Sequence, residues 1–129
     1  MSYTKLTPNL VVRDVARSLE FYTGILGFQR GITVPEAAPF VFGSVTAPGI
    51  EIYFNEQSSA VAEYPELAGM PIGGTLTLFL EVDDVAALHA RVQKAGVKIL
   101  HPMEDKFYGM REFAIADLDG WMLTLAQKI

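Results

Sequence analysis

The fold is decided by the stretch Leu6-Thr7-Pro8-Asn9-Leu10-Val11-Val12-Arg13-Asp14-Val15-Ala16, because its pattern returns seventy positions later. The second copy reads Leu76-Thr77-Leu78-Phe79-Leu80-Glu81-Val82-Asp83-Asp84-Val85-Ala86. In both copies a run with period-two alternation precedes an Asp that is followed by Val-Ala. Such alternation predicts a half-buried strand, and Asp is a favoured N-cap for a following helix. The repeat therefore predicts two copies of one supersecondary unit.

Each predicted strand is followed by an amphipathic helix of about three turns. The apolar stripes are formed by Val15, Leu19, Tyr22 and Leu26 in the first copy, and by Val85, Leu88, Val92 and Ala95 in the second. Gly27 and Gly96 stand directly after the two stripes. Glycine at this place ends a helix in a left-handed cap, so both helices are expected to stop there.

Three further strand-like runs follow each predicted helix. They cover about 29–33, 40–46 and 49–54 in the first copy, and about 98–101, 110–116 and 121–126 in the second. Turn signals separate them at Pro48-Gly49 and at Asp117-Leu118-Asp119-Gly120. Each copy therefore reads βαβββ. Module 1 is expected over about 3–55 and module 2 over about 74–129, joined by a linker of about 56–73 that carries a short helical turn.

These modules predict a single α+β domain in which two tandem βαβββ units form an open, half-barrel-like sheet around a cavity. Each helix covers only one face of its sheet, and the other faces carry Thr7, Asn9, Glu51, Tyr53, Thr77, Phe79, Glu81 and Thr124. This mixture of polar and aromatic groups is typical of a ligand pocket. The alternative is a solvent-facing side of an antiparallel sheet, although Tyr53, Phe79 and Met122 would make a poor solvent face.

Composition excludes several classes of protein. The chain has 129 residues, no cysteine and a formal net charge of −5, with Lys and Arg scattered along it. Disulfides, thiolate metal sites and cysteine nucleophiles are therefore impossible, and a nucleic-acid partner is not expected. No apolar run reaches the ~20 residues that span a bilayer, so we expect no membrane association and a cytoplasmic location.

Two stretches resemble a known family. Val12-Arg13-Asp14-Val15-Ala16-Arg17-Ser18-Leu19-Glu20-Phe21-Tyr22-Thr23-Gly24-Ile25-Leu26-Gly27-Phe28 is similar to the helix signature of the vicinal oxygen chelate superfamily, which includes glyoxalases, bleomycin resistance proteins and extradiol dioxygenases. Tyr108-Gly109-Met110-Arg111-Glu112-Phe113-Ala114-Ile115-Ala116-Asp117-Leu118-Asp119-Gly120 resembles its C-terminal strand and hairpin, in the form of the bleomycin-resistance branch. The resemblance implies the fold and leaves several activities open.

In the metal-dependent members of that superfamily, four strands each supply one ligand, usually His or Glu. The resemblance carries these positions onto Thr7, Glu51, Thr77 and Thr124. Hydroxyls are weak metal donors at neutral pH, so this set predicts no metal and no cofactor. His89 is expected on the polar side of the second helix, and His101 is expected in a loop that could line the mouth of the cavity.

The resemblance therefore implies a metal-independent protein that binds a small organic molecule, in the manner of antibiotic sequestration, as a homodimer. The alternatives are a metal-dependent lyase, isomerase or dioxygenase of the same superfamily, with Glu51 as the candidate base, and a purely structural dimerisation module. The expected ligand-binding residues are Thr7, Asn9, Glu51, Tyr53, Thr77, Phe79, Tyr108, Arg111 and Thr124. Arg111 has a second interpretation, an ion pair with Glu112 or another acid.

Overall fold

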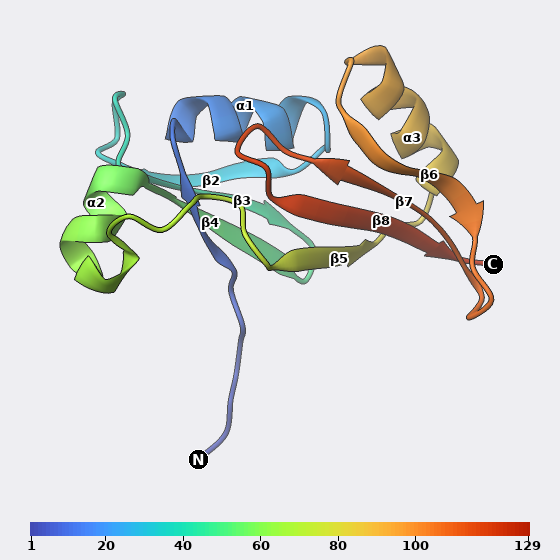
Figure 1. The fold of residues 1–129 in the computed structure, drawn as a ribbon, viewed down its shortest axis with the longest axis horizontal. Coiled ribbons are helices and arrows are strands. Elements are labelled where there is room, and N and C mark those ends of the chain that lie inside the picture. The colour runs from blue at the N-terminus through green and yellow to red at the C-terminus, as the bar shows by residue number, and fades with distance from the viewer. The chain divides into compact units, whose positions relative to one another are not determined.

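The computed structural model describes all residues from 1 to 129, and the chain divides into two compact units, Met1–Met70 and Pro71–Ile129. Each unit contains one open four-stranded sheet, in the order β1-β4-β3-β2 in the first and β5-β8-β7-β6 in the second. In each unit the first strand pairs in parallel with the last, and the other pairs are antiparallel (Figure 1). This architecture confirms the predicted α+β fold with two tandem βαβββ modules.

The first unit is built in the predicted order. Its elements are β1 (Asn9–Val12), α1 (Val15–Gly24), β2 (Gln29–Val34), β3 (Phe42–Ala47) and β4 (Ile50–Glu56), followed by α2 (Gln57–Glu63) and the 3₁₀ turn η1 (Pro65–Leu67). The last two replace the single helical turn expected in the linker. The Tyr22 ring of α1 packs against the buried Phe54 of β4, with ring centroids 4.8 Å apart, so α1 covers one face of this sheet.

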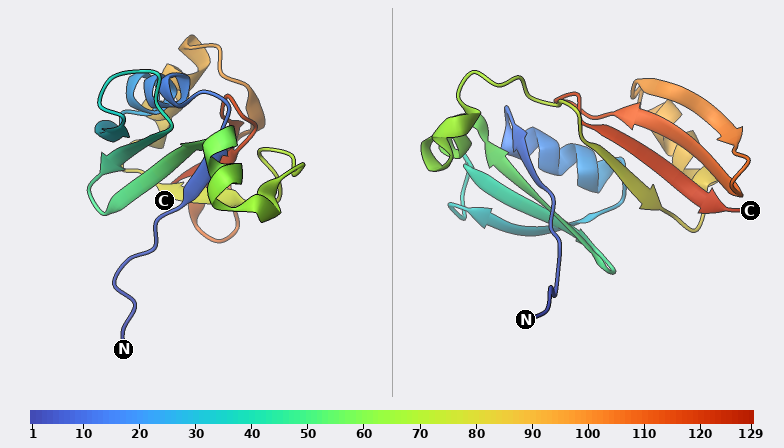
Figure 2. Two further views of the ribbon diagram at one scale, coloured as in Figure 1. Left: turned by 90° about the vertical axis from the view of Figure 1, so that its left-hand side faces the viewer. Right: turned by 60° about the horizontal axis from the view of Figure 1, so that its bottom comes forward.

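The first strand is shorter than predicted. The parallel ladder with β4 starts at Asn9, which pairs with Tyr53, and Leu6 is 86% exposed. The N-terminal segment that precedes β1 extends away from the sheet of the first unit (Figure 2). The alternation correctly predicts that Leu10 and Val12 lie in the core. It cannot show that Leu6 has no pairing partner in β4.

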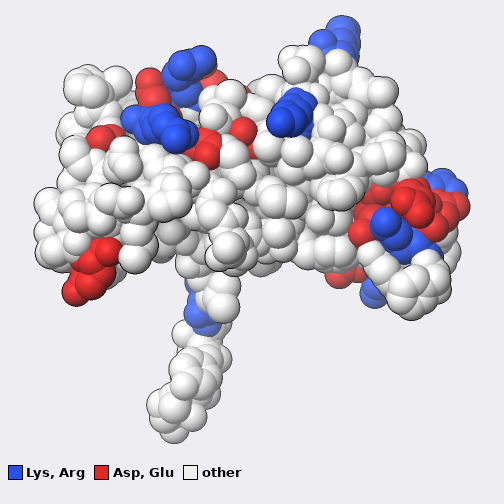
Figure 3. Space-filling view, viewed as in Figure 1, with Lys and Arg blue, Asp and Glu red and all other residues white.

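The second unit repeats the pattern with β5 (Thr77–Glu81), α3 (Val85–Lys94), β6 (Ile99–Asp105), β7 (Met110–Ala116) and β8 (Met122–Lys128). Strand β6 extends beyond the predicted run and includes Pro102. It tolerates proline because it is the edge strand, and its register shifts on both sides of His101. The β6–β7 hairpin carries a dense cluster of charges at one end of this unit (Figure 3), formed by Glu104, Asp105, Lys106 and Arg111.

Both helices begin as the sequence predicts, and α3 ends just before Gly96, but α1 ends at Gly24 and so leaves out Leu26 of the predicted stripe. Asp14 accepts a hydrogen bond from the backbone N–H of Arg17 at 3.2 Å, and Asp84 accepts one from that of Ala87 at 3.0 Å. After the helices, Gly27 and Gly96 adopt φ angles of 81° and 72°, which favour glycine because it has no Cβ. No helix in the structure is long and apolar enough to cross a membrane.

Candidate ligand site

The strand register brings side chains from three strands to the uncovered face of the second sheet. Ala114 of β7 pairs with Thr124 of β8 on one side and with His101 of β6 on the other. Glu112 lies two residues before Ala114 and therefore points to the same face. The opposite face carries the buried Phe113, Ile115, Leu123 and Leu125, as expected for the side that packs toward α3. Polar groups thus gather where the helix does not cover the sheet.

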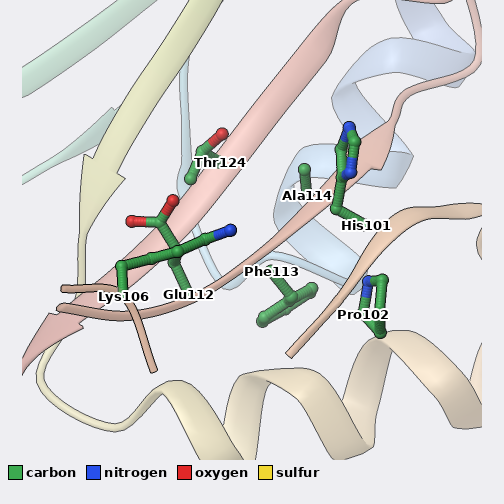
Figure 4. Close-up of a pocket in the computed structure, with 7 residues that line it drawn as sticks. All are labelled: His101, Pro102, Lys106, Glu112, Phe113, Ala114 and Thr124. Atoms are coloured by element: carbon green, nitrogen blue, oxygen red, sulfur yellow. The ribbon is translucent and has the colours of Figure 1, made fainter. Parts of the chain in front are cut away.

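A pocket of about 230 Å³ opens on this face (Figure 4). Its lining combines four groups able to form hydrogen bonds with three apolar residues: His101, Lys106, Glu112 and Thr124, together with Pro102, Phe113 and Ala114. All seven belong to the second unit. A small number of polar groups on an otherwise apolar wall is the usual composition of a site for an organic molecule.

Glu112 is the most unusual residue of the pocket. It is only 9% exposed, and its Oε1 accepts a hydrogen bond of 2.7 Å from the hydroxyl of Tyr108. Its Oε2 is buried and has no hydrogen-bond partner within the protein. Buried carboxylate oxygens are nearly always paired, so an unpaired one calls for an explanation. In Figure 4 the carboxylate lies among the lining side chains of Lys106 and Thr124.

The cations nearest this carboxylate along the chain are held by other acids. Lys106 forms an ion pair with Glu104 at 3.3 Å. Arg111 forms two hydrogen bonds with Asp105, of 2.6 and 3.1 Å. The Arg111 guanidinium holds the pKa of Asp105 below its ordinary value, mainly through this hydrogen bonding. Arg111 thus has the ion-pair role that the sequence left open, with Asp105 as the acid, and it does not line the pocket.

The uncovered face of the first sheet is organised differently. Glu51 forms an ion pair with Lys5, and this hydrogen bond raises the pKa of the lysine. The side-chain amide of Asn55 donates to the side-chain oxygen of Asn9. Tyr53 packs edge-on against Phe42, with ring centroids 5.0 Å apart. Glu51 and Asn9 on this face are therefore each engaged by a side chain of the same unit.

The four positions carried over from metal-dependent relatives do not fit a transition-metal ion. They hold one carboxylate, Glu51, which is engaged by Lys5, and three threonine hydroxyls. In the second unit the register pairs Thr77 with Met122 and Thr124 with Phe79, so these two threonines are not direct cross-strand partners. Thr77 is exposed, whereas Thr7 and Thr124 are half-buried.

The ligand-binding residues predicted from the sequence include part of the pocket lining, but not Glu112 or Lys106. Thr124 lines it, and Tyr108 contacts it through Glu112. The sequence indicates Glu112 only as a partner for Arg111, and it gives no signal for Lys106. Alternation within β7 was the available signal, because it sets Glu112 on the same face as Ala114.

The two histidines differ in how they meet expectation. His101 lies in strand β6, which continues past the predicted end of that run at 101, and it lines the pocket. His89 is half-buried, and its ring meets Phe113 edge-on with centroids 4.9 Å apart, so the expectation of a solvated helix residue was wrong.

Comparison with known proteins agrees with this fold. The model of the glyoxalase/bleomycin resistance protein/dioxygenase superfamily matches residues 5–125. A bleomycin resistance protein from Geobacillus stearothermophilus is 28% identical over 127 residues, with 95% of each chain covered. An antibiotic binding protein from a Streptomyces species is 24% identical and superimposes with a TM-score of 0.78, over 100% of this chain and 99% of that one.

A family enzyme from Burkholderia phytofirmans reaches a TM-score of 0.80 at 18% identity, over 95% of this chain and 97% of that one. At such identities the solved structures establish the fold alone. The family match, by contrast, covers nearly the whole sequence with both modules. The chain belongs to the glyoxalase/bleomycin resistance protein/dioxygenase superfamily.

Proposed function

We propose that this protein binds a small organic molecule without the help of a metal ion, in the pocket of the second unit. The observation that carries the proposal is the pocket itself, in which Glu112, Lys106, His101 and Thr124 converge on an otherwise apolar wall. Its volume of about 230 Å³ accommodates a small molecule or one part of a larger one.

The relatives support binding as the activity. One is named a bleomycin resistance protein, and a structural neighbour is described as an antibiotic binding protein. The donor set supports independence from metal, because Glu51 is already paired with Lys5 and threonine hydroxyls are weak ligands. A metal-dependent lyase, isomerase or dioxygenase is the competing function. It predicts that a divalent ion binds stoichiometrically.

The predicted ligand-binding residues divide between the two units. Thr77, Phe79, Tyr108 and Thr124 belong to the second unit, and we assign Thr124 to direct contact and Tyr108 to orienting Glu112. The residues of the first unit, Thr7, Asn9, Glu51 and Tyr53, remain predicted ligand contacts on the uncovered face of their own sheet.

A thermal-shift screen of organic compounds tests the proposal, with bleomycin included because of the named relative. A compound that binds the native state raises the melting temperature. Thr124→Leu should fill the pocket and abolish that rise, whereas Thr23→Leu, in helix α1 of the first unit, should retain it. A screen without any stabilising compound, or an unchanged rise in Thr124→Leu, would count against the proposal.

The homodimer expected from the sequence is part of the same proposal. Strands β1 and β5 each lie at an edge of their sheet, and the exposed Phe79 and Leu76 leave apolar surface near β5. Edge strands and apolar patches favour association between copies. Light scattering should give twice the mass of one chain at micromolar concentration. A concentration-independent monomer would exclude the dimer and leave the pocket within one chain unaffected.

A further inference from the structure

The two oxygens of the Glu112 carboxylate have different surroundings. Oε1 accepts the hydroxyl of Tyr108 at 2.7 Å, whereas Oε2 is buried with no partner in the protein. The side chain is more than nine-tenths buried, and it lines the pocket. Because a buried acceptor without a donor is unfavourable, this oxygen is suited to accept a hydrogen bond from a bound molecule.

The charges around Glu112 favour a cationic donor. Lys106, the cation among the lining residues, is paired with Glu104 at 3.3 Å, and Arg111 is paired with Asp105. The two hairpin cations are thus matched by two acids, which leaves the charge of Glu112 without a counter-ion among them. A carboxylate binds a charged N–H donor more strongly than a neutral one.

The remaining walls suit the carbon body of such a ligand. Pro102 and Ala114 supply apolar surface, and Thr124 and His101 lie across the same cross-strand row. We infer that the pocket is selective for small organic amines, with the protonated nitrogen of the ligand donating to Oε2 of Glu112. This inference rests on the proposed binding function and names the chemical class of its ligand.

Tyr108 acts as a positioning residue in this arrangement. Its hydroxyl engages Oε1, so Oε2 is the carboxylate oxygen left for a ligand. The ring of Tyr108 is itself held edge-on by Phe107, with centroids 5.1 Å apart. Loss of the hydroxyl should therefore weaken amine binding less than loss of the carboxylate, because the acceptor remains present.

The first test compares three probes on the unmodified protein and needs no variant. Benzylamine, benzyl alcohol and benzoate have nearly the same size and ring but differ in charge. Titration calorimetry at neutral pH should show benzylamine binding at least about tenfold more tightly than benzyl alcohol, the smallest ratio expected for a hydrogen bond to a charged group. Benzoate should not bind measurably.

The second test removes the charge of the acceptor. Glu112→Gln should weaken benzylamine binding at least about tenfold and leave benzyl alcohol binding unchanged within about twofold. Tyr108→Phe should reduce benzylamine affinity by a smaller factor. Glu66→Gln makes the same change of charge on an exposed residue of the first unit and should leave all three affinities unchanged.

The outcomes separate this inference from the proposed function. Equal affinities for amine and alcohol, or tighter binding of benzoate, would overturn selectivity for amines while leaving small-molecule binding in place. A protein that binds no probe and no compound of the thermal-shift screen would overturn both. If Glu112→Gln does not fold, the comparison of probes on the unmodified chain still decides the question.

Discussion

Tyr108 donates its hydroxyl proton to Glu112 across 2.7 Å, and this contact ties the β6–β7 hairpin to the carboxylate that lines the pocket. The tyrosine is about half exposed, whereas the glutamate is buried. One hydrogen bond therefore couples a surface side chain to the centre of the candidate site. The pKa of Tyr108 therefore responds to a change in the side chain of residue 112.

The pKa of the Tyr108 phenol is predicted to fall toward its ordinary value in Glu112→Gln. The hydrogen bond to Glu112 is the largest cause that raises this pKa, followed by burial and by the charges of Glu112 and Glu104. A pH titration followed by NMR of labelled tyrosine rings measures it. Tyr64, whose pKa is raised by Glu63, is the internal control and should not move.

The raised pKa of Tyr108 makes the free energy of unfolding depend on pH in the alkaline range. The folded state favours the neutral phenol of Tyr108, so its contribution is complete below the ordinary tyrosine pKa of about 10 and is lost as pH rises through the raised value. An identical loss of stability at high pH in the unmodified protein and in Glu112→Gln would contradict the coupling.

Arg111→Gln is predicted to raise the pKa of Asp105 back toward its ordinary value. The arginine holds the carboxylate with hydrogen bonds of 2.6 and 3.1 Å, and this bonding is the main cause of the lowered pKa. The stabilisation is therefore present above the ordinary Asp pKa of about 3.9 and is lost as pH falls through the lowered value. NMR titration of the Asp105 carboxyl measures the shift.

The same variant separates a structural role of Arg111 from a ligand-binding role. Because its guanidinium is engaged by Asp105 and does not line the pocket, benzylamine affinity should be unchanged in Arg111→Gln. A loss of affinity with an unperturbed pKa for Asp105 would instead assign Arg111 to the ligand, as the sequence pattern first indicated.

The two N-cap residues are predicted to contribute similarly to stability. Asp14→Ala and Asp84→Ala should each lower the free energy of unfolding by about 1 kcal/mol, because each removes the acceptor of a first-turn backbone N–H. Urea denaturation measures the loss. Glu20→Ala, at an exposed position within α1, provides the control without a cap. A large loss at Asp14 with none at Asp84 would show that the repeated caps are not equivalent in energy.

A chelator is predicted to leave the melting temperature unchanged. A metal bound only by the native state would stabilise that state, and its removal would lower the melting temperature. The carboxylate at the carried-over positions, Glu51, is occupied by Lys5. A fall with EDTA that one divalent ion restores would support the competing metal-dependent function.

Sequence alone was sufficient for the parts of this fold that depend on local physics. Alternation, helical spacing and the caps at Asp14 and Asp84 are set by neighbours within a few residues, so the starts of α1 and α3 could be placed correctly. The beginning of β1 could not, because whether Leu6 continues the strand depends on where β4 offers a partner.

The candidate site was decided by the tertiary structure. His101, Glu112 and Thr124 come from three strands, and they meet only through a register that shifts around His101 in the β6 edge strand. No spacing along the chain encodes that shift. Alternation showed which face each residue of β7 takes, but only the packed sheet revealed that one oxygen of Glu112 is satisfied by Tyr108 and the other is left buried without a donor, since burial and pairing are properties of the assembled strands.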